Sequence, residues 1–86
     1  MAYYVYIIES LQDGTLYKGF TENYIQRLEQ HNLGLSMYTS SKTPWRLLYV
    51  EEFAVKRDAL IKEKQLKRCN SNYLRWLATQ PTNIIK

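Results

Sequence analysis

The fold is decided by the stretch YYVYIIESLQDGTLYKGF, residues 3–20. Residues 3–10 are a run of β-branched and aromatic residues with no helix former before Glu9, and neither alternating set of side chains is polar, which predicts a strand buried on both faces. The Asp13-Gly14 pair that follows is a strong hairpin signal before the returning strand. Gly19 in that returning strand marks a position where backbone or a ligand approaches closely. The stretch therefore predicts a β-hairpin with one crowded position.

The segment after the hairpin predicts a helix from its capping and its apolar spacing. Thr21 is placed to cap it, because a threonine hydroxyl can accept a hydrogen bond from the first turn. Tyr24, Ile25, Leu28 and His31 share one arc at helical spacing, and Gly34 supplies a stop. A lone histidine on an apolar face is more often a structural residue than a ligand, so His31 alone does not define a site.

The whole chain predicts one α/β (α+β) domain over residues 1–86, with order ββαβαα and a three-stranded antiparallel sheet flanked by helices. After the first strand we expect a strand at 15–20, the helix capped by Thr21, a polar loop at 35–44, a strand at 45–52, a basic helix at 55–69, a short helix at 70–80 capped by Asn70 or Ser71, and a tail at 81–86 that is loose or packed back. The core that carries the motifs is residues 3–68.

Composition and charge narrow the class of protein. With 45% hydrophobic and 23% charged residues, the chain is neither collagen-like nor a disordered tail. No apolar run approaches the roughly 18 residues of a membrane span, and the N-terminus lacks the basic region of a signal peptide. Cys69 is the only cysteine, so we expect a reducing cytoplasm. Residues 1–52 carry a net charge of −2 and residues 53–86 a net charge of +6, which favours a polyanionic partner or a solvated basic helix.

Three titratable or charged side chains fall inside or beside apolar helical arcs. At about 100° per residue, Glu63 lies about 40° from Ala59 and inside the arc that includes Leu66. A carboxylate buried there must be paired, protonated or bound to a cation, because burying it bare costs several kcal/mol. The alternative is a helix at the domain edge, with Glu63 reaching solvent or an arginine.

Arg27 and His31 are i, i+4 neighbours on the first predicted helix. Charged or titratable side chains in apolar surroundings tend to cluster at functional sites.

Two tripeptides and three later residues follow the order of a known family. They are Tyr4-Val5-Tyr6, then Tyr17-Lys18-Gly19 after ten intervening residues, then Arg27, His31 and Glu63. This set resembles the GIY-YIG nuclease superfamily, and the segments YVYII, GTLYKGFT, RLEQHN, LLYVEEF and ALIKEKQLK make the chain similar to its small stand-alone bacterial members. The chain departs from the pattern where Tyr4 replaces a glycine, which would narrow the site. It also has Phe20 where some relatives carry a lysine, which leaves one fewer cation for the phosphate.

The resemblance implies a divalent-metal-dependent endonuclease that hydrolyses DNA, directed by structure or damage, in repair or processing. It implies that Glu63 holds a single Mg²⁺ or Mn²⁺ and that Arg27 binds the scissile phosphate. Either Tyr6 or Tyr17 would orient or deprotonate the attacking water, and His31 would hold a tyrosine or shuttle a proton. For both tyrosines the competing interpretation is that they fill the core as ordinary strand residues.

The basic C-terminal half predicts contacts to nucleic-acid phosphates, with DNA favoured over RNA. The expected contact residues are Lys18 in the hairpin, together with Lys56, Lys64, Lys67 and Arg68 in the basic half. Such contacts position a duplex but carry no sequence information, and no reader of base edges is expected in this chain. The alternative function is a nucleic-acid-binding module of the same fold with little or no catalytic activity. A protein-interaction domain has little positive support, and the sequence leaves the oligomeric state open.

Overall fold

The computed structural model describes residues 1–85. Its elements are β1 (Tyr3–Ser10), β2 (Leu16–Thr21), α1 (Tyr24–Asn32), a 3-10 turn η1 (Ser40–Lys42), β3 (Trp45–Phe53), α2 (Lys56–Leu66) and α3 (Ser71–Leu77). The three strands form one antiparallel sheet in the order β2-β1-β3. The predicted fold class and element order are therefore confirmed. No helix within residues 1–85 is long and apolar enough to cross a membrane.

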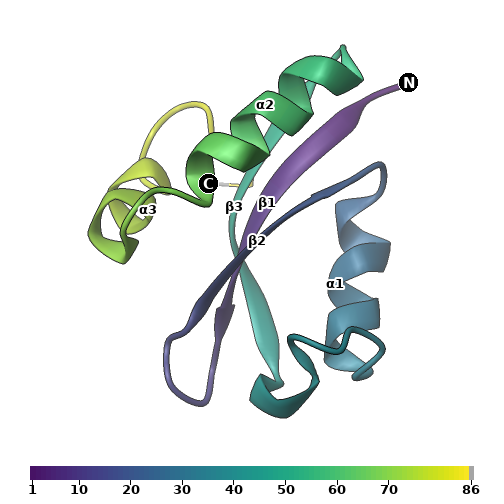
Figure 1. The fold of residues 1–86 in the computed structure, drawn as a ribbon, viewed down its shortest axis with the longest axis vertical. Coiled ribbons are helices and arrows are strands. Elements are labelled where there is room, and N and C mark those ends of the chain that lie inside the picture. The colour runs from purple at the N-terminus through teal and green to yellow at the C-terminus, as the bar shows by residue number, and fades with distance from the viewer. Residues whose placement is uncertain (86) are drawn as a thin grey trace.

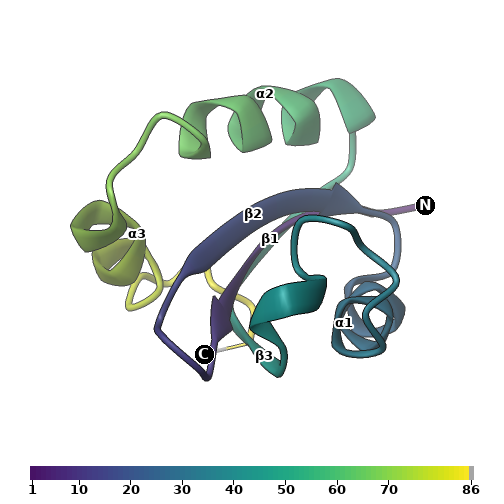
Figure 2. The same ribbon diagram turned by 60° about the horizontal axis from the view of Figure 1, so that its bottom comes forward.

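The strand β1 lies at the centre of the sheet and is covered on both faces. Figure 1 shows β1 crossing between the other strands, and Figure 2 shows α2 on one face of the sheet and α1 on the other. Val5 and Ile7 point into the cluster formed with α2 and α3, whereas Tyr6 and Ile8 point into the cluster on the α1 side. The prediction of a strand buried on both faces is confirmed. Burial on both faces explains why neither alternating set of side chains in residues 3–8 is polar.

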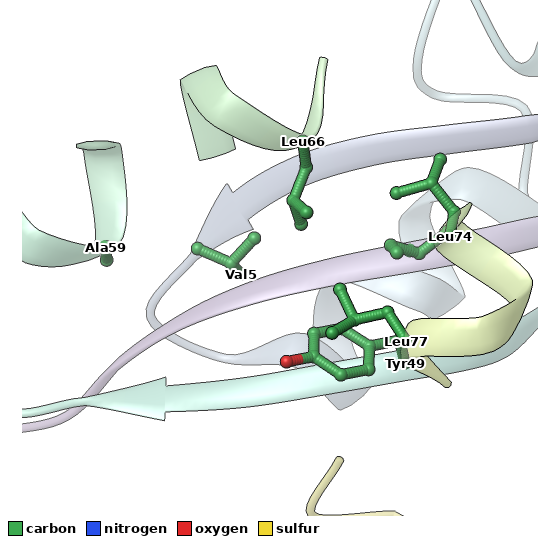
Figure 3. Close-up of a cluster of buried hydrophobic side chains, with 7 residues drawn as sticks. Val5, Tyr49, Ala59, Leu66, Leu74 and Leu77 are labelled. Carbon is green, nitrogen blue, oxygen red and sulfur yellow. The ribbon is translucent and has the colours of Figure 1, made fainter. Parts of the chain in front are cut away.

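The larger core lies between the sheet and the two C-terminal helices. Figure 3 shows Val5 and Tyr49 of the strands facing side chains of α2 and α3, which are Ala59, Leu66, Leu74 and Leu77. Burying each large side chain in this cluster contributes roughly 1.5–3 kcal/mol. The phenol of Tyr49 is satisfied at the edge of the cluster, where it donates to Glu51 Oε1. This core fixes α2 across β1 and β2, where its side chains can reach the sheet.

The hairpin turn follows the predicted chemistry. Gly14 has φ +78°, which an L side chain rarely adopts, and its N–H donates to the Ser10 carbonyl over 2.9 Å. The Asp13 carboxylate accepts from the Thr15 N–H over 3.0 Å. The returning strand begins at residue 16 rather than 15, because Thr15 still belongs to this turn.

The start of α1 differs from the prediction. Thr21 is not the cap, because Asn23 holds that position and its Oδ1 accepts from the Gln26 N–H over 3.0 Å. The Thr21 hydroxyl instead accepts from the Asn23 N–H over 3.1 Å and shapes the turn before the helix. The predicted stop is confirmed, since α1 ends at Asn32 and Gly34 follows with φ +75°. The helix therefore holds two turns between a strong cap and a glycine.

The segment after α1 is not a uniformly polar loop. It contains the turn η1, and its apolar residues Leu35, Met37 and Tyr38 are exposed. Thr39, directly after them, is fully buried. A side chain of this loop thus reaches the core on the α1 side.

The C-terminal helices and tail follow the prediction in part. The helix α2 spans residues 56–66 rather than 55–69, and Val55 is its exposed cap rather than part of the apolar arc. Asn70 caps α3 as predicted, with its Oδ1 accepting from the Tyr73 N–H. Of the two options for the tail, packing back holds for the described part, because the buried Asn83 accepts from the Val50 N–H over 3.1 Å. Lys86 lies outside the described residues.

Candidate active site

The site begins with the register of the hairpin. Tyr6 on β1 lies directly opposite Gly19 on β2. A Cβ at position 19 would stand 2.5 Å from Cζ and 2.8 Å from Cε1 of the Tyr6 ring, so the ring covers the glycine backbone. The close approach that Gly19 predicts is therefore that of Tyr6, the tyrosine of the other tripeptide.

A chain of buried hydrogen bonds joins Tyr6 to the loop after α1. The Tyr6 hydroxyl lies 2.8 Å from His31 Nε2, and His31 Nδ1 lies 2.7 Å from the Thr39 hydroxyl. His31 and Thr39 are fully buried, and Tyr6 is 2% exposed. The imidazole thus has a partner on each ring nitrogen, which fixes its orientation against Tyr6.

Tyr17 and Arg27 approach the same hydroxyl and imidazole from two different elements. Tyr17 lies opposite Ile8, two residues before Gly19, so it shares the face of Tyr6. Its ring meets the His31 ring edge-on with centroids 5.3 Å apart. The Arg27 guanidinium reaches the Tyr6 hydroxyl from α1 and donates over 2.9 Å to the side chain of Gln30. The structure therefore brings together four predicted residues from β1, β2 and α1.

The burial of this cluster sets the charge of its central pair. Burial raises the pKa of Tyr6 to about 12, although Arg27 opposes that shift. Burial, and then the positive charge of Arg27, lowers the pKa of His31 to about 4. At neutral pH both side chains are uncharged, so Tyr6 is not present as a phenolate and His31 has a free lone pair.

Because of this shift, the folded chain should lose stability between pH 6.5 and pH 4. The unfolded imidazole takes a proton near pH 6.5, whereas in the folded state it stays neutral down to about pH 4. The unfolded state then binds more protons in this window, so the free energy of unfolding falls as the pH falls. The full shift of His31 corresponds to roughly 3 kcal/mol.

The measurement is urea unfolding over this pH range for the wild type and for His31→Gln, which removes the titrating group. The difference in unfolding free energy between the two proteins should move by roughly 3 kcal/mol in favour of the variant on acidification. A difference that stays constant from pH 6.5 to pH 4 would show that His31 does not resist protonation.

Glu63 lies on α2, and the interaction that links it to this cluster is electrostatic. Its side chain is 20% exposed, and its carboxylate lies 3.6 Å from Lys67 Nζ. The negative charge of Glu63 contributes to raising the pKa of Tyr6, which places the carboxylate within electrostatic reach of the phenol. Glu63 is therefore partly buried and forms an ion pair with Lys67. This is one of the options predicted for a carboxylate inside the apolar arc, namely that it is paired.

The donor set fits only one kind of metal site. Within residues 1–85, no three His, Cys, Asp or Glu side chains gather where they could hold an ion together. A single half-buried carboxylate suits Mg²⁺, which keeps several waters and is commonly bound by one or two carboxylates plus substrate phosphates. It does not suit Zn²⁺, which needs three or four protein ligands.

The two departures from the family pattern are both accommodated. The Tyr4 ring packs edge-on against Tyr24, with centroids 5.0 Å apart. Phe20 lies among the core residues of the α2 face, stacked on Tyr3 and with Lys56 Nζ 6.0 Å above its ring. The Phe20 ring therefore does not face Tyr6. The ammonium group of Lys56 lies over this ring, at the position where some relatives carry a lysine.

The predicted phosphate contacts do not share one surface. Lys18 lies opposite Ile7, on the face of the sheet away from Tyr6. Lys56 and Lys67 flank the side of α2 that carries Glu63. Lys64 and Arg68 line a shallow groove on α2 together with Ile61 and Gln65.

Thr39 was not predicted as a site residue. It lies in a loop, where no periodicity indicates which side chain turns inward, and it is eight residues from its partner His31. The one available signal was the need of a buried histidine for a second hydrogen-bond partner.

The fold is that of a GIY-YIG domain. A family model described as the GIY-YIG catalytic domain matches residues 2–74, and the chain belongs to this family. Among its relatives, the UPF0213 protein of Pediococcus pentosaceus is 39% identical over 77 residues, which is 87% of this chain and 80% of that protein. The UPF0213 protein of Haloquadratum walsbyi is 35% identical over 95% of this chain and 92% of its own length.

A solved structure shows the same fold. The solution NMR structure of the UPF0213 protein BH0048 from Bacillus halodurans matches with a TM-score of 0.60 and 29% identity, over 99% of this chain and 90% of that one. The names of these relatives specify no activity. Family membership therefore indicates a nuclease-type domain, and the reaction of this chain has to be argued from its own residues.

Proposed function

We propose that this protein is a divalent-metal-dependent endonuclease that hydrolyses phosphodiester bonds in DNA, with substrates chosen by structure or damage during repair or processing. The observation that carries the proposal is the hydrogen bond of 2.8 Å between the Tyr6 hydroxyl and a neutral His31. The Tyr17 ring contacts His31, and the charges of Arg27 and Glu63 act on Tyr6. Charged groups are costly next to a buried phenol in a purely structural core. An arginine and a glutamate near Tyr6 therefore favour a functional site.

The proton of the attacking water would pass through Tyr6. A phenol with a pKa of about 12 is a poor source of phenolate at neutral pH. Tyr6 would instead take the proton from water while its own proton moves to His31 Nε2, so that no free phenolate forms. The negative charge of the bound phosphate would offset the burial and the Arg27 charge that keep His31 neutral in the free protein. The water oxygen bonds to phosphorus, the bond from phosphorus to the 3′ oxygen breaks, and that oxygen leaves with the electron pair and takes a proton from solvent. Tyr17, on the same face, would orient the water.

Arg27 and Glu63 would handle the charge of the phosphate. The planar guanidinium of Arg27 can bind two phosphoryl oxygens in a bidentate manner. Glu63 would hold Mg²⁺ or Mn²⁺, which when bound supplies neutralisation of charge on the phosphoryl oxygens. Lys67 already pairs with Glu63, so the ion would compete with this lysine for the carboxylate.

The exposed lysines and arginine would bind the flanking backbone. Contacts from Lys18, Lys56, Lys64, Lys67 and Arg68 would be sequence-independent, since phosphate contacts position a duplex without reading it. Lys56 and Lys67 are best placed for phosphates next to the scissile bond, because they flank the side of α2 that bears Glu63. We propose DNA rather than RNA as the polymer on the resemblance to the GIY-YIG nucleases.

A second function, a nucleic-acid-binding module with little or no catalysis, is favoured by one observation. Tyr6 is only 2% exposed, so a substrate has little access to its hydroxyl. In this alternative the tyrosines and His31 stabilise the fold, and the cations alone carry the function.

The test is cleavage and binding of DNA duplexes, flaps, forks, single strands and matched RNA, with Mg²⁺, with Mn²⁺ and with chelator. We expect cleavage of at least one DNA shape in the presence of metal and binding without cleavage in chelator. Binding of every shape without cleavage under any condition would favour the binding module. Failure to bind any nucleic acid at low salt would exclude both functions.

A further inference from the structure

Thr39 is a buried polar side chain that contacts a predicted site residue, His31, without being among the predicted residues. Its hydroxyl lies 2.7 Å from His31 Nδ1, and the residue is fully buried. Its carbonyl accepts from the Trp45 indole N–H over 2.9 Å and from the Lys42 N–H over 3.2 Å. The threonine is thus held by the backbone of its own loop and by the first residue of β3.

The anchoring of Thr39 extends back to α1, which carries His31. Trp45 is buried, and its backbone N–H donates over 2.6 Å to the side chain of Asn32, the last residue of α1. The Asn32 amide donates in return to the Trp45 carbonyl over 3.1 Å. Because Asn32 follows His31 directly, the histidine and its threonine partner are joined through β3 as well as through the loop.

Counting donors and acceptors assigns the tautomer of His31. A neutral imidazole has one N–H donor and one acceptor nitrogen. If Nε2 carried the proton, the Tyr6 hydroxyl would face a donor there and the guanidinium of Arg27, which is also only a donor. The phenolic hydrogen of the nearly buried Tyr6 would then have no acceptor within the part of the chain that the structure describes.

In the opposite tautomer, each polar hydrogen of His31, Tyr6 and Thr39 has an acceptor. Nδ1–H donates to the Thr39 hydroxyl, and the Tyr6 hydroxyl donates to Nε2. The Thr39 hydroxyl hydrogen then turns to the Ser36 carbonyl at 3.5 Å, a long contact that leaves the threonine oxygen mainly as an acceptor. This is the tautomer in which Nε2 presents its lone pair to Tyr6.

We propose that Thr39 is a positioning residue that holds His31 in the Nδ1–H tautomer, so that Nε2 can accept the proton of Tyr6. This inference rests on the proposed nuclease function only for its effect on rate. Its structural part, which nitrogen carries the proton and why, stands on the hydrogen-bond geometry and is tested separately.

The test is the ¹⁵N NMR spectrum of the imidazole in the untagged, full-length chain. His31 is the only histidine, so every imidazole signal belongs to it. At pH 7 we expect a pyrrole-type shift for Nδ1 and a pyridine-type shift for Nε2. Thr39→Ser, which keeps the hydroxyl, should preserve this pattern. Thr39→Val, which keeps the shape and removes the acceptor, leaves Nδ1–H without a partner and should move a measurable fraction of the molecules to the Nε2–H tautomer.

Two spectral results would overturn the inference. A wild type with the proton on Nε2 would show that the donor count is wrong, and this holds even if no variant folds. A Thr39→Val protein that keeps the proton on Nδ1 would show that Thr39 does not set the tautomer. Thr39→Ala gives the same comparison if the valine variant does not fold.

The rate measurement separates this inference from the proposed function. If the wild type cuts DNA, Thr39→Val should lower kcat by about 10–100-fold with little change in KM, and Thr39→Ser should restore most of it. Equal kcat values for wild type and Thr39→Val, despite a changed tautomer, would overturn the role in proton transfer. A wild type that cuts nothing but shows the expected tautomer would refute the nuclease proposal and leave the assignment of Thr39 supported.

Discussion

Glu63→Gln is expected to abolish metal-dependent cleavage while leaving the fold and DNA binding intact. The amide keeps the shape of the side chain but loses the charge that would hold the ion. A bound metal supplies several kcal/mol of transition-state stabilisation, and each 1.36 kcal/mol is a factor of ten in rate. We therefore expect a loss of about 10²–10³-fold in single-turnover cleavage, relative to wild type at the same metal concentration.

The stability of this variant should hardly change, and this separates a catalytic effect from unfolding. The substitution removes one i, i+4 ion pair with the exposed Lys67, at 3.6 Å, and such pairs are worth about 0.3–0.5 kcal/mol. Glu29→Gln makes the same change on an exposed position of α1 and should cut like the wild type. Wild-type rates for Glu63→Gln would remove Glu63 from the site. Equal binding by both proteins with no cleavage by either would favour the binding module.

Gly19→Ala is expected to destabilise the protein by roughly 2–4 kcal/mol. The new methyl group would overlap the ring of Tyr6, which is nearly buried and hydrogen-bonded to His31. Overpacking costs about 1–3 kcal/mol, and disturbing a buried hydrogen bond adds about 1–3, whereas the lost freedom of glycine returns only about 0.4–1. For a chain of this size the melting temperature should fall by roughly 10–20 °C.

A double-mutant cycle attributes this effect to the contact with Tyr6. In a Tyr6→Leu background the atoms that meet the new methyl group are absent, so Gly19→Ala should cost under about 0.5 kcal/mol. The backbone at Gly19 does not have a positive φ, so strain of the backbone does not contribute. An equal cost of Gly19→Ala in both backgrounds would show that the glycine is needed for some reason other than the phenol.

The sequence by itself determined the parts of the fold that depend on neighbouring residues. The Asp13-Gly14 turn, the stop at Gly34 and the Asn70 cap need only local hydrogen bonds and backbone angles. The same local chemistry explains the error at Thr21. Two residues near the start of α1 could both cap it, and the sequence has no means of choosing between Thr21 and Asn23.

The sequence also named the members of the candidate site, although their contacts depended on tertiary structure. Tyr6, Tyr17, Arg27, His31 and Glu63 were predicted together from the family resemblance. That Tyr6 lies over Gly19 follows from the register of the hairpin, and its hydrogen bond to His31 follows from the packing of α1 on the sheet. Both contacts join elements that are separated in the sequence. The hydrophobic periodicity of a single element does not specify them.

Only the tertiary structure decided which partner each charged or buried polar group has. It left Glu63 only partly buried, turned Lys18 to the face of the sheet that α2 covers, and placed Thr39 against His31. These outcomes depend on the angle at which a helix or loop crosses the sheet, and that angle is set by the shapes of the whole core. Local sequence specifies which groups must find a partner, because leaving them buried and alone is costly, and the packed chain specifies which partner is within reach.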